Sequence, residues 1–208
     1  MQKRLRLWSL PGGNENYIIT LKKCLAFIKE TNPHQEQIKD WCFQTFPSVE
    51  SERTVKDSIG VIKNLGLIKG VGDKFLLNEE GERFLKTHNN TLVYQLLDTK
   101  YKGIHDIIEL LYKKPQTLNE ICSSLRKKIG VNWKKETQCR VRLNWLCSIG
   151  YVAKDRQQYR LTKEGRNSVK GESIVEKKAL THLEIQEIII KLGKAYSLHA
   201  EKEIHFSE

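Results

Sequence analysis

The chain has 208 residues, of which 39% are hydrophobic and 29% charged, and it contains only 4 prolines. This composition indicates a folded, soluble chain. No apolar run approaches the roughly 18 residues that span a bilayer, which argues against a membrane protein. The N-terminal segment 1–13 is too broken by Arg6 and Ser9 to form a secretory leader. The 5 cysteines, an odd number without a close pair, indicate buried thiols in a reducing cytoplasm.

The formal net charge of +11 is unevenly distributed along the chain. Residues 1–88 contain 14 basic and 11 acidic residues, residues 89–171 contain 17 and 7, and residues 172–208 contain 5 and 7. Nearly all the excess lies in the middle segment, which projects a positive field toward a polyanion. Nucleic acid is therefore the leading partner class and a membrane surface the second. A merely solvated lysine-rich surface remains the alternative.

The segment that ends at Gly66 predicts three helices after a short N-terminal arm. Apolar residues recur at helical spacing in three stretches, and Pro33 separates the first stretch from the second. Ser51 is a suitable N-cap for the third helix, and Gly66 tolerates the left-handed geometry at its end. The three apolar faces are Tyr17, Leu21, Cys24, Leu25 and Ile28, then Ile38, Trp41, Cys42 and Phe46, and then Val55, Ile59, Ile62 and Leu65.

A predicted hairpin follows the third helix. Two short strands flank the turn signal Gly72-Asp73, and the second strand ends at Leu77. Asn78 then begins a short helix. Three helices followed by a two-stranded wing are the element order of a winged helix.

The second part of the chain repeats this order. Pro115 separates the first two predicted helices, and Thr117 with Glu120 has the spacing of a capping box. The hairpin turn falls at residues 154–157, and a short helix begins at Thr162. The three apolar faces are Ile104, Ile107, Ile108 and Leu111, then Leu118, Ile121, Cys122 and Leu125, and then Cys139, Leu143, Leu146 and Ile149, with Gly150 closing the third helix.

The two parts align with each other at a constant offset and without a gap. Residues 64–85 fall on residues 148–169, with four identities and several similar apolar positions in register. We therefore predict a mainly α (α+β) chain with two tandem winged-helix domains, residues 1–88 and 89–171, followed by a C-terminal helix. The identical pairs are Gly66 and Gly150, Leu77 and Leu161, Glu80 and Glu164, and Gly81 and Gly165.

In a helix-turn-helix unit the second helix of the pair enters the major groove of DNA, and here this is the third helix of each copy. Arg, Asn and Gln side chains can make bidentate hydrogen bonds to guanine or adenine edges, and wing cations contact phosphates or a minor groove. The second copy has the better set and is expected to supply most of the affinity. The predicted DNA-binding residues are Arg53, Thr54, Lys56, Lys63, Lys134, Lys135, Thr137, Gln138, Arg140, Asn144, Lys154, Arg156, Gln157 and Arg160; Asp57, Gly60 and Val141 complete the outward-facing sets.

Several conspicuous residues are expected to have structural roles rather than to bind a ligand. Trp145 is expected to pack at the edge of the core with Arg142 covering it. Trp8, Trp41 and Trp133 are expected in the core rather than as base-stacking platforms, because Trp41 lies on an apolar helical face and Trp133 lies where the second turn must pack. The six histidines lack metal-ligand spacing, and residues 10–13 lack the Lys and Ser/Thr of a phosphate-binding loop, so neither a zinc site nor a phosphate loop is predicted.

The tail after Gly171 predicts one helix at about residues 178–196 and a strand-like segment at 197–206. Its apolar residues Leu183, Ile185, Ile188, Ile189 and Leu192 cannot close a core of their own. The tail, residues 172–208, is therefore expected either to pack on the winged helices or to be the start of a third domain that continues past Glu208, and the strand-like end without a partner favours the second alternative.

The run Leu7-Trp8-Ser9-Leu10-Pro11, the paired segments LGLI…LNEEG and IGYV…LTKEG, and the tail LEIQEIIIKLGKAY followed by HAEKEI resemble bacterial restriction endonucleases. In these enzymes a tandem winged-helix recognition region precedes a nuclease domain of the PD-(D/E)XK type. The resemblance covers nearly the whole chain. It implies that a carboxylate of the opening nuclease helix, Glu184 or Glu187, helps to hold Mg²⁺ in the complete nuclease.

The remaining metal-binding carboxylates of that family belong on strands further along. The two acidic-x-Lys triplets of this chain, residues 98–100 and 176–178, are no more than chance supplies. We therefore expect no cofactor and no nuclease activity from this chain alone, and a Mg²⁺-dependent parent enzyme.

The leading hypothesis is sequence-specific or modification-specific binding of double-stranded DNA, as the recognition module of a restriction endonuclease. A second hypothesis is a winged-helix transcriptional regulator that forms a homodimer through residues 178–196. A third is a protein-docking scaffold with the same fold.

Overall fold

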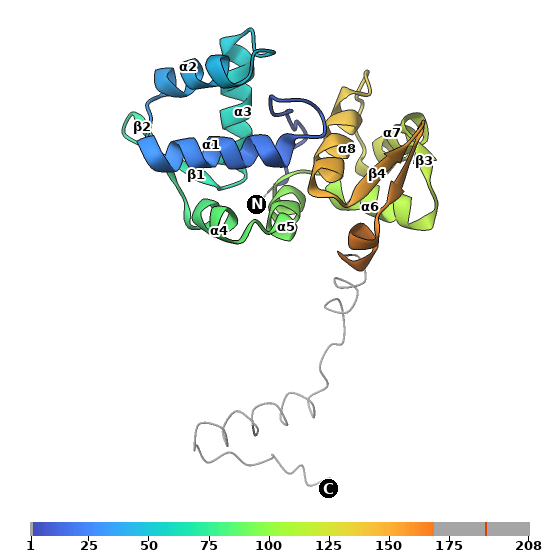
Figure 1. The fold of residues 1–208 in the computed structure, drawn as a ribbon. Coiled ribbons are helices and arrows are strands. Elements are labelled where there is room, and N and C mark those ends of the chain that lie inside the picture. The colour runs from blue at the N-terminus through green and yellow to red at the C-terminus, as the bar shows by residue number, and fades with distance from the viewer. Residues whose placement is uncertain (1, 169–189, 191–208) are drawn as a thin grey trace, which may run out of the picture. The chain divides into compact units, whose positions relative to one another are not determined.

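The structure is a computed structural model that describes residues 2–168 and residue 190. The chain divides into two compact units, Met1–Ser168 and Val169–Glu208. All helices and strands given below belong to the first unit (Figure 1). The predicted tail helix and strand, with Glu184 and Glu187, lie outside the described residues.

The first half contains helices α1 (Tyr17–Thr31), α2 (Gln35–Thr45) and α3 (Glu52–Asn64), then strands β1 (Ile68–Val71) and β2 (Lys74–Leu77) and helix α4 (Glu79–Thr87). The two strands pair antiparallel, with Ile68 opposite Leu77. Ser51 caps α3 as predicted, because its side chain accepts a hydrogen bond from the Thr54 amide.

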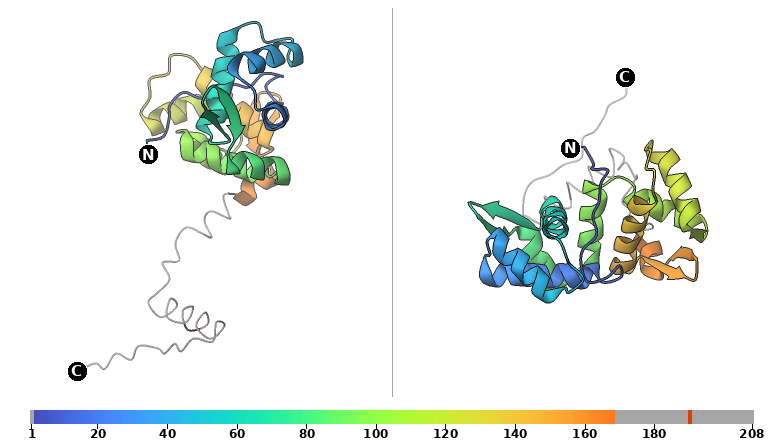
Figure 2. Two further views of the ribbon diagram at one scale, coloured as in Figure 1. Left: turned by 90° about the vertical axis from the view of Figure 1, so that its left-hand side faces the viewer. Right: turned by 90° about the horizontal axis from the view of Figure 1, so that it is seen from above.

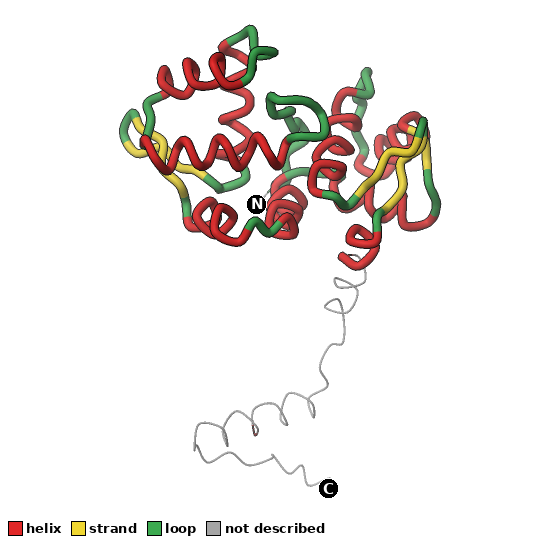
Figure 3. Tube along the Cα trace, viewed as in Figure 1, coloured by secondary structure: helices red, strands yellow, loops and turns green. Residues whose placement is uncertain are grey.

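The second half contains α6 (Ile104–Lys113), β3 (Gln116–Thr117), α7 (Leu118–Ile129), α8 (Thr137–Ile149), β4 (Val152–Asp155) and β5 (Gln158–Leu161), and residues 163–168 are helical. The three strands form an antiparallel sheet in the order β3-β5-β4 (Figure 3). The predicted capping box of Thr117 and Glu120 is present. A mainly helical, winged-helix-like fold is therefore confirmed.

Two elements were not predicted. Helix α5 (Asn90–Lys100) lies between the halves and buries Leu92, Val93, Tyr94 and Leu97 against α4, α6 and α8. Strand β3 is only two residues long, and its first-half counterpart is the single bridge between His34 and Lys74. Both elements depend on contacts with distant parts of the chain. The local spacing of apolar residues carries no information about such contacts.

The two halves pack directly on each other within this unit. Helix α1 contacts α8 (Figure 1), and the rings of Tyr17 and Trp145 lie 5.1 Å apart. The amide of Ile18 donates a hydrogen bond of 2.8 Å to the Ser148 hydroxyl. The N-terminal segment runs between the halves (Figure 2), where Arg4 pairs with the Tyr101 backbone.

The sequence identities of the repeat have a structural cause. The carbonyl oxygen of Leu67 accepts from the Asn78 amide at 2.9 Å, and in the second copy the carbonyl oxygen of Tyr151 accepts from the Thr162 amide at 3.0 Å. In each copy a glycine packs on the same carbonyl group. A Cβ atom on Gly81 would lie 2.2 Å from the Leu67 oxygen, and one on Gly165 would lie 2.2 Å from the Tyr151 oxygen.

A Gly165→Ala substitution is therefore expected to destabilise the fold. Its methyl group would overlap a backbone atom that the wing holds in place, which should lower the free energy of unfolding by about 1–3 kcal/mol. The control is Gly60→Ala in α3, where a Cβ would meet no atom within 4 Å; there alanine should stabilise the helix by roughly 0.5–1 kcal/mol. Urea unfolding of both variants measures the difference, and equal stabilities would contradict this packing.

Three of the four tryptophans are less buried than expected. Trp8, Trp41 and Trp133 are half-buried rather than in the core, and Trp41 stacks on Phe27 with ring centroids 4.6 Å apart, whereas Trp145, expected at the edge of the core, is fully buried. All five cysteines are free thiols, four of them buried, and Cys147 is half-buried. Among the helices that the structure describes, none is long and apolar enough to cross a membrane.

Candidate nucleic-acid interface

Helix α8 presents only a narrow strip to solvent. Its sequence buries seven residues, because α1, α5, α6 and α7 and strand β4 all pack against it. Val141, expected to face outward, is 8% exposed and belongs to this buried set. Arg140 remains exposed and Asn144 is half-buried. These two side chains, one turn apart, form the accessible polar edge of the helix.

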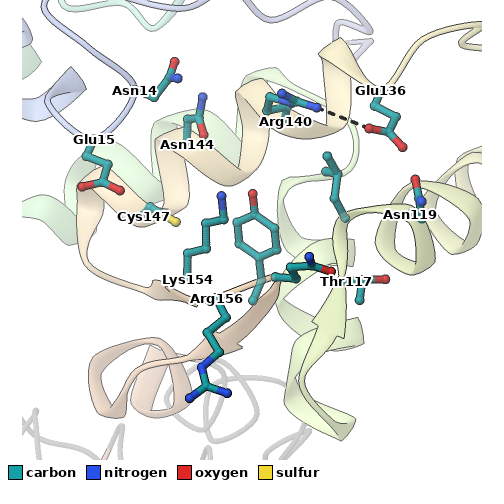
Figure 4. Close-up of a pocket in the computed structure, with 13 residues that line it drawn as sticks. Asn14, Glu15, Thr117, Asn119, Glu136, Arg140, Asn144, Cys147, Lys154 and Arg156 are labelled. Carbon is teal, nitrogen blue, oxygen red and sulfur yellow. Dashed lines mark hydrogen bonds and ion pairs between the residues drawn. The ribbon is translucent and has the colours of Figure 1, made fainter.

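A polar groove lies between this edge and the second hairpin, and we call it the α8–wing groove (Figure 4). It has a volume of about 380 Å³. Figure 4 shows Lys154 extending from β4 toward α8, opposite Arg140 and Asn144. The groove is lined by Asn14, Glu15, Thr117, Leu118, Asn119, Glu136, Arg140, Asn144, Cys147, Lys154, Arg156, Gln157 and Tyr159.

A second hollow flanks α8 on the side of the N-terminal arm, residues 1–13. Asn14, Glu136, Arg140 and Asn144 line both hollows, so Arg140 and Asn144 stand on a ridge between them. The exposed residues Lys134, Lys135 and Thr137 border this second hollow at the start of α8. Of the predicted cations of the second copy, Lys134, Lys135, Arg140, Lys154 and Arg156 therefore line one or both of these hollows, and Arg160 lines neither.

Gln138 is placed differently from the prediction. It was expected to read base edges, but its side-chain amide holds the N-terminal arm. Its Oε1 atom accepts from the Leu7 amide at 2.9 Å, and its Nε2 atom donates to the Leu7 carbonyl at 3.2 Å. These two bonds resemble the paired hydrogen bonds between neighbouring β-strands. Both the oxygen and the nitrogen of the Gln138 amide are therefore occupied within the protein.

Arg142 is also placed differently. It was expected to cover Trp145, but its side chain is fully buried and lies under the arm. Its guanidinium donates to the carbonyls of Leu5 at 2.7 Å, Lys102 at 2.8 Å and Gln138 at 2.8 Å, and it stacks over the Trp133 ring at 4.6 Å. Burial lowers the pKa of Arg142 to about 10, so the group is still charged at neutral pH.

Together these contacts fix the arm beside the ridge. The Trp145 indole donates to the Trp8 carbonyl at 3.1 Å, which extends the set of side-chain bonds from α8 to the arm. Ser9 consequently borders the second hollow with Arg140 and Asn144. Sequence reasoning missed this arrangement because the arm and α8 are far apart along the chain.

The second wing, which is the hairpin of β4 and β5, carries the other predicted cations. Lys154, Arg156, Gln157 and Arg160 are all exposed, and the Lys154 ammonium lies 5.9 Å from the centre of the Tyr159 ring. Arg140 makes a long ion pair of 3.4 Å with Glu136, and its side chain remains 58% exposed. Weak exposed ion pairs of this kind break at little cost when a stronger anion arrives.

The turn of the second wing has an unusual backbone. Arg156 has φ 52°, in the left-handed region that disfavours residues with a Cβ atom. Gly72, which aligns with Arg156 in the repeat, has φ 60° in the corresponding turn of the first wing. The same turn is thus built once with the favoured residue and once with an exposed arginine.

The first copy presents a more neutral surface. Arg53, Thr54, Lys56 and Lys63 are exposed as predicted, but acidic residues lie among them. Lys39 pairs with both Glu36 and Glu52, and Arg53 lies 4.0 Å from Asp57. The first copy therefore has less free positive charge than the second.

Within the described residues, no three His, Cys, Asp or Glu side chains are close enough together to hold a metal ion. The carboxylates that the resemblance assigns to Mg²⁺, Glu184 and Glu187, lie outside those residues.

No protein-family model matches this chain, and no curated protein matches it by sequence. A solved structure does match by fold: the crystal structure of pyrene- and phenanthrene-modified DNA in complex with the BpuJ1 endonuclease binding domain. The TM-score is 0.56 at 10% identity, over 85% of this chain and 90% of that one. At this identity the similarity establishes a shared fold.

Proposed function

We propose that this chain binds double-stranded DNA through α8, the second wing and the arm beside them. The observation that carries the proposal is the ridge of Arg140 and Asn144, flanked by two polar hollows and by exposed cations on three segments. Helix edges with Arg and Asn read bases in the major groove, while lysines and wing arginines neutralise phosphates. The shared fold with an endonuclease binding domain solved on DNA supports the same function.

We further propose that the chain is the recognition module of a restriction endonuclease, built from two tandem winged helices, residues 1–88 and 89–171. The fold similarity and the sequence resemblance of the tail support this reading. Cleavage would belong to a Mg²⁺-dependent nuclease domain that begins in the tail. The chain itself would supply position and sequence preference on the duplex.

Selection from a random duplex pool tests this function. The full chain is incubated with unmodified and with methylated pools, and bound duplexes are sequenced. Enrichment of one motif in either pool is the expected result, because α8 carries base-reading side chains. Binding without any enrichment in both pools would contradict a recognition module and leave only a non-specific DNA-binding protein.

The turn of the second wing provides a separate prediction. Replacing Arg156 with glycine should leave the free energy of unfolding unchanged or raise it by up to about 1 kcal/mol, since glycine suits the left-handed backbone. Duplex affinity should nevertheless fall, and the slope of log affinity against log salt should decrease by about one, because one phosphate contact is lost.

Fluorescence anisotropy over a salt series measures both quantities for Arg156→Gly. The control is Lys86→Ala on α4, which also removes one exposed cation but borders neither hollow beside α8. An Arg156→Gly protein that binds as tightly as the unmodified chain would show that the wing turn does not contact DNA.

A further inference from the structure

The first half carries a groove at the position that the α8–wing groove occupies in the second half. We call it the α3–wing groove; it lies between α2, α3 and β2 and has a volume of about 210 Å³. Five of its lining residues on α3 and β2 align, in the register of the repeat, with residues that line the α8–wing groove. These pairs are Glu52 and Glu136, Lys56 and Arg140, Gly60 and Asn144, Lys63 and Cys147, and Phe75 and Tyr159. The two grooves are therefore one feature of the repeat with different chemistry.

The α3–wing groove has an apolar floor. Ile38 and Val55 are buried there, and Ile59 and Phe75 are half-buried at its surface. Gly60 stands where the second copy has the base-reading Asn144. A small apolar group can therefore enter this groove, whereas the α8–wing groove offers an amide.

Gly60 leaves open space that the protein does not use. A Cβ atom there would meet no described atom within 4 Å, so packing does not require glycine. Glycine inside a helix is nevertheless destabilising by about 1 kcal/mol relative to alanine. Its lack of a side chain instead allows a ligand to approach the α3 backbone closely.

The rim carries both hydrogen-bond acceptors and donors, and among the described residues its charged groups without an ion pair are donors. The carboxylates of Glu36 and Glu52 are both paired with Lys39, and the Glu52 pair measures 3.3 Å. Among the described residues, Lys56 and Lys63 form no ion pair and are exposed. The groove thus offers an apolar floor beside free ammonium groups.

We propose that the α3–wing groove reads a thymine edge in the major groove of the bound duplex, an inference that rests on the proposed function. Thymine presents a C5-methyl group next to the O4 acceptor. The methyl group would lie against Ile59 and Phe75 over Gly60, and O4 would accept from Lys56 or Lys63. Methylated cytosine has the same methyl group beside an N4 donor, which Lys56 and Lys63 do not complement and for which the only described charged acceptors at the rim are the Lys39-paired carboxylates of Glu36 and Glu52.

Thymine-to-uracil substitution tests the inference with the full chain. In a duplex obtained by selection, each thymine is replaced singly by 2′-deoxyuridine, which removes only the methyl group. We expect about fourfold weaker binding at one or two positions, the effect of burying one methyl group, and no change elsewhere.

The Gly60→Asn variant links those positions to this groove. An asparagine should fold normally because its Cβ meets no atom, and it should fill the groove so that uracil and thymine bind equally well. The control is Gly130→Asn, where φ is 66°, a conformation that asparagine tolerates at a helix end. Gly130 lines neither groove, so this variant should keep the fourfold difference.

The outcomes separate this inference from the proposed function. Salt-sensitive duplex binding without any thymine effect, or with an effect that Gly60→Asn retains, would overturn the inference and leave DNA binding intact. Equal binding of 5-methylcytosine in place of the sensitive thymine would overturn the assignment to thymine. A chain that binds no duplex would overturn both.

Discussion

Replacing Arg140 with alanine is expected to relax the sequence preference of the chain more than any wing substitution does. Arg140 stands on the ridge between two hollows. Its only ion pair among the described residues is the exposed one of 3.4 Å with Glu136, which a base contact could replace. A bidentate contact with a base is worth about 1–3 kcal/mol of discrimination. Arg140→Ala should therefore bring the preferred duplex and a single-mismatch duplex to within about 1 kcal/mol of each other at the position it reads.

Asn144→Ala should act in the same way at a different base pair. The matched control is Lys154→Ala, whose side chain extends across the α8–wing groove from β4 (Figure 4). Loss of this lysine should weaken binding to all duplexes almost equally, because a phosphate contact carries no base identity. Competition titrations with mismatch duplexes measure these differences. If Lys154→Ala changed the preference more than Arg140→Ala, α8 would not be the reading helix.

Replacing Arg142 with alanine is expected to produce the largest loss of stability in this chain. The substitution removes four hydrogen bonds from a fully buried guanidinium and leaves the carbonyls of Leu5 and Lys102 without this donor. It also opens a cavity under the Trp133 ring. Truncations of large buried side chains cost about 3–5 kcal/mol, and we expect the same range here.

Urea unfolding of the full chain measures the Arg142 effect. Arg140→Ala is the control, because Arg140 is on the same helix but exposed, and its loss should change stability by no more than about 0.5 kcal/mol. The two arginines, close together on one helix, thus have opposite roles: one stabilises the fold, and the other faces the proposed ligand. Equal stabilities of the two variants would contradict the structural role of Arg142.

Much of the fold could be predicted from the sequence because positions that pack in the same way in the two copies carry identical or similar residues. Gly81 and Gly165 are conspicuous only as identities between the two copies, yet each packs against a backbone carbonyl where no other residue fits. The helical spacing of apolar residues likewise located α1, α2, α3, α6, α7 and α8. These signals are local, and the structure confirms them.

The residues that hold the arm could not be predicted in this way. Gln138 and Arg142 are polar residues on a helix that the sequence predicts to face DNA, and polarity alone indicates exposure. Their partners Leu7 and Leu5 lie near the N-terminus, far from α8 along the chain. Only the folded chain shows that these side chains are used internally, while Arg140 and Asn144 remain accessible.

We propose that the second half binds duplex DNA through its exposed cations. The most direct test is the affinity of the full chain for a selected duplex between about 50 and 200 mM salt. If about five phosphates are contacted, affinity should fall on the order of 10²- to 10³-fold over this range. Affinity that stays constant across the series, or no duplex binding at the lowest salt, would contradict the claim.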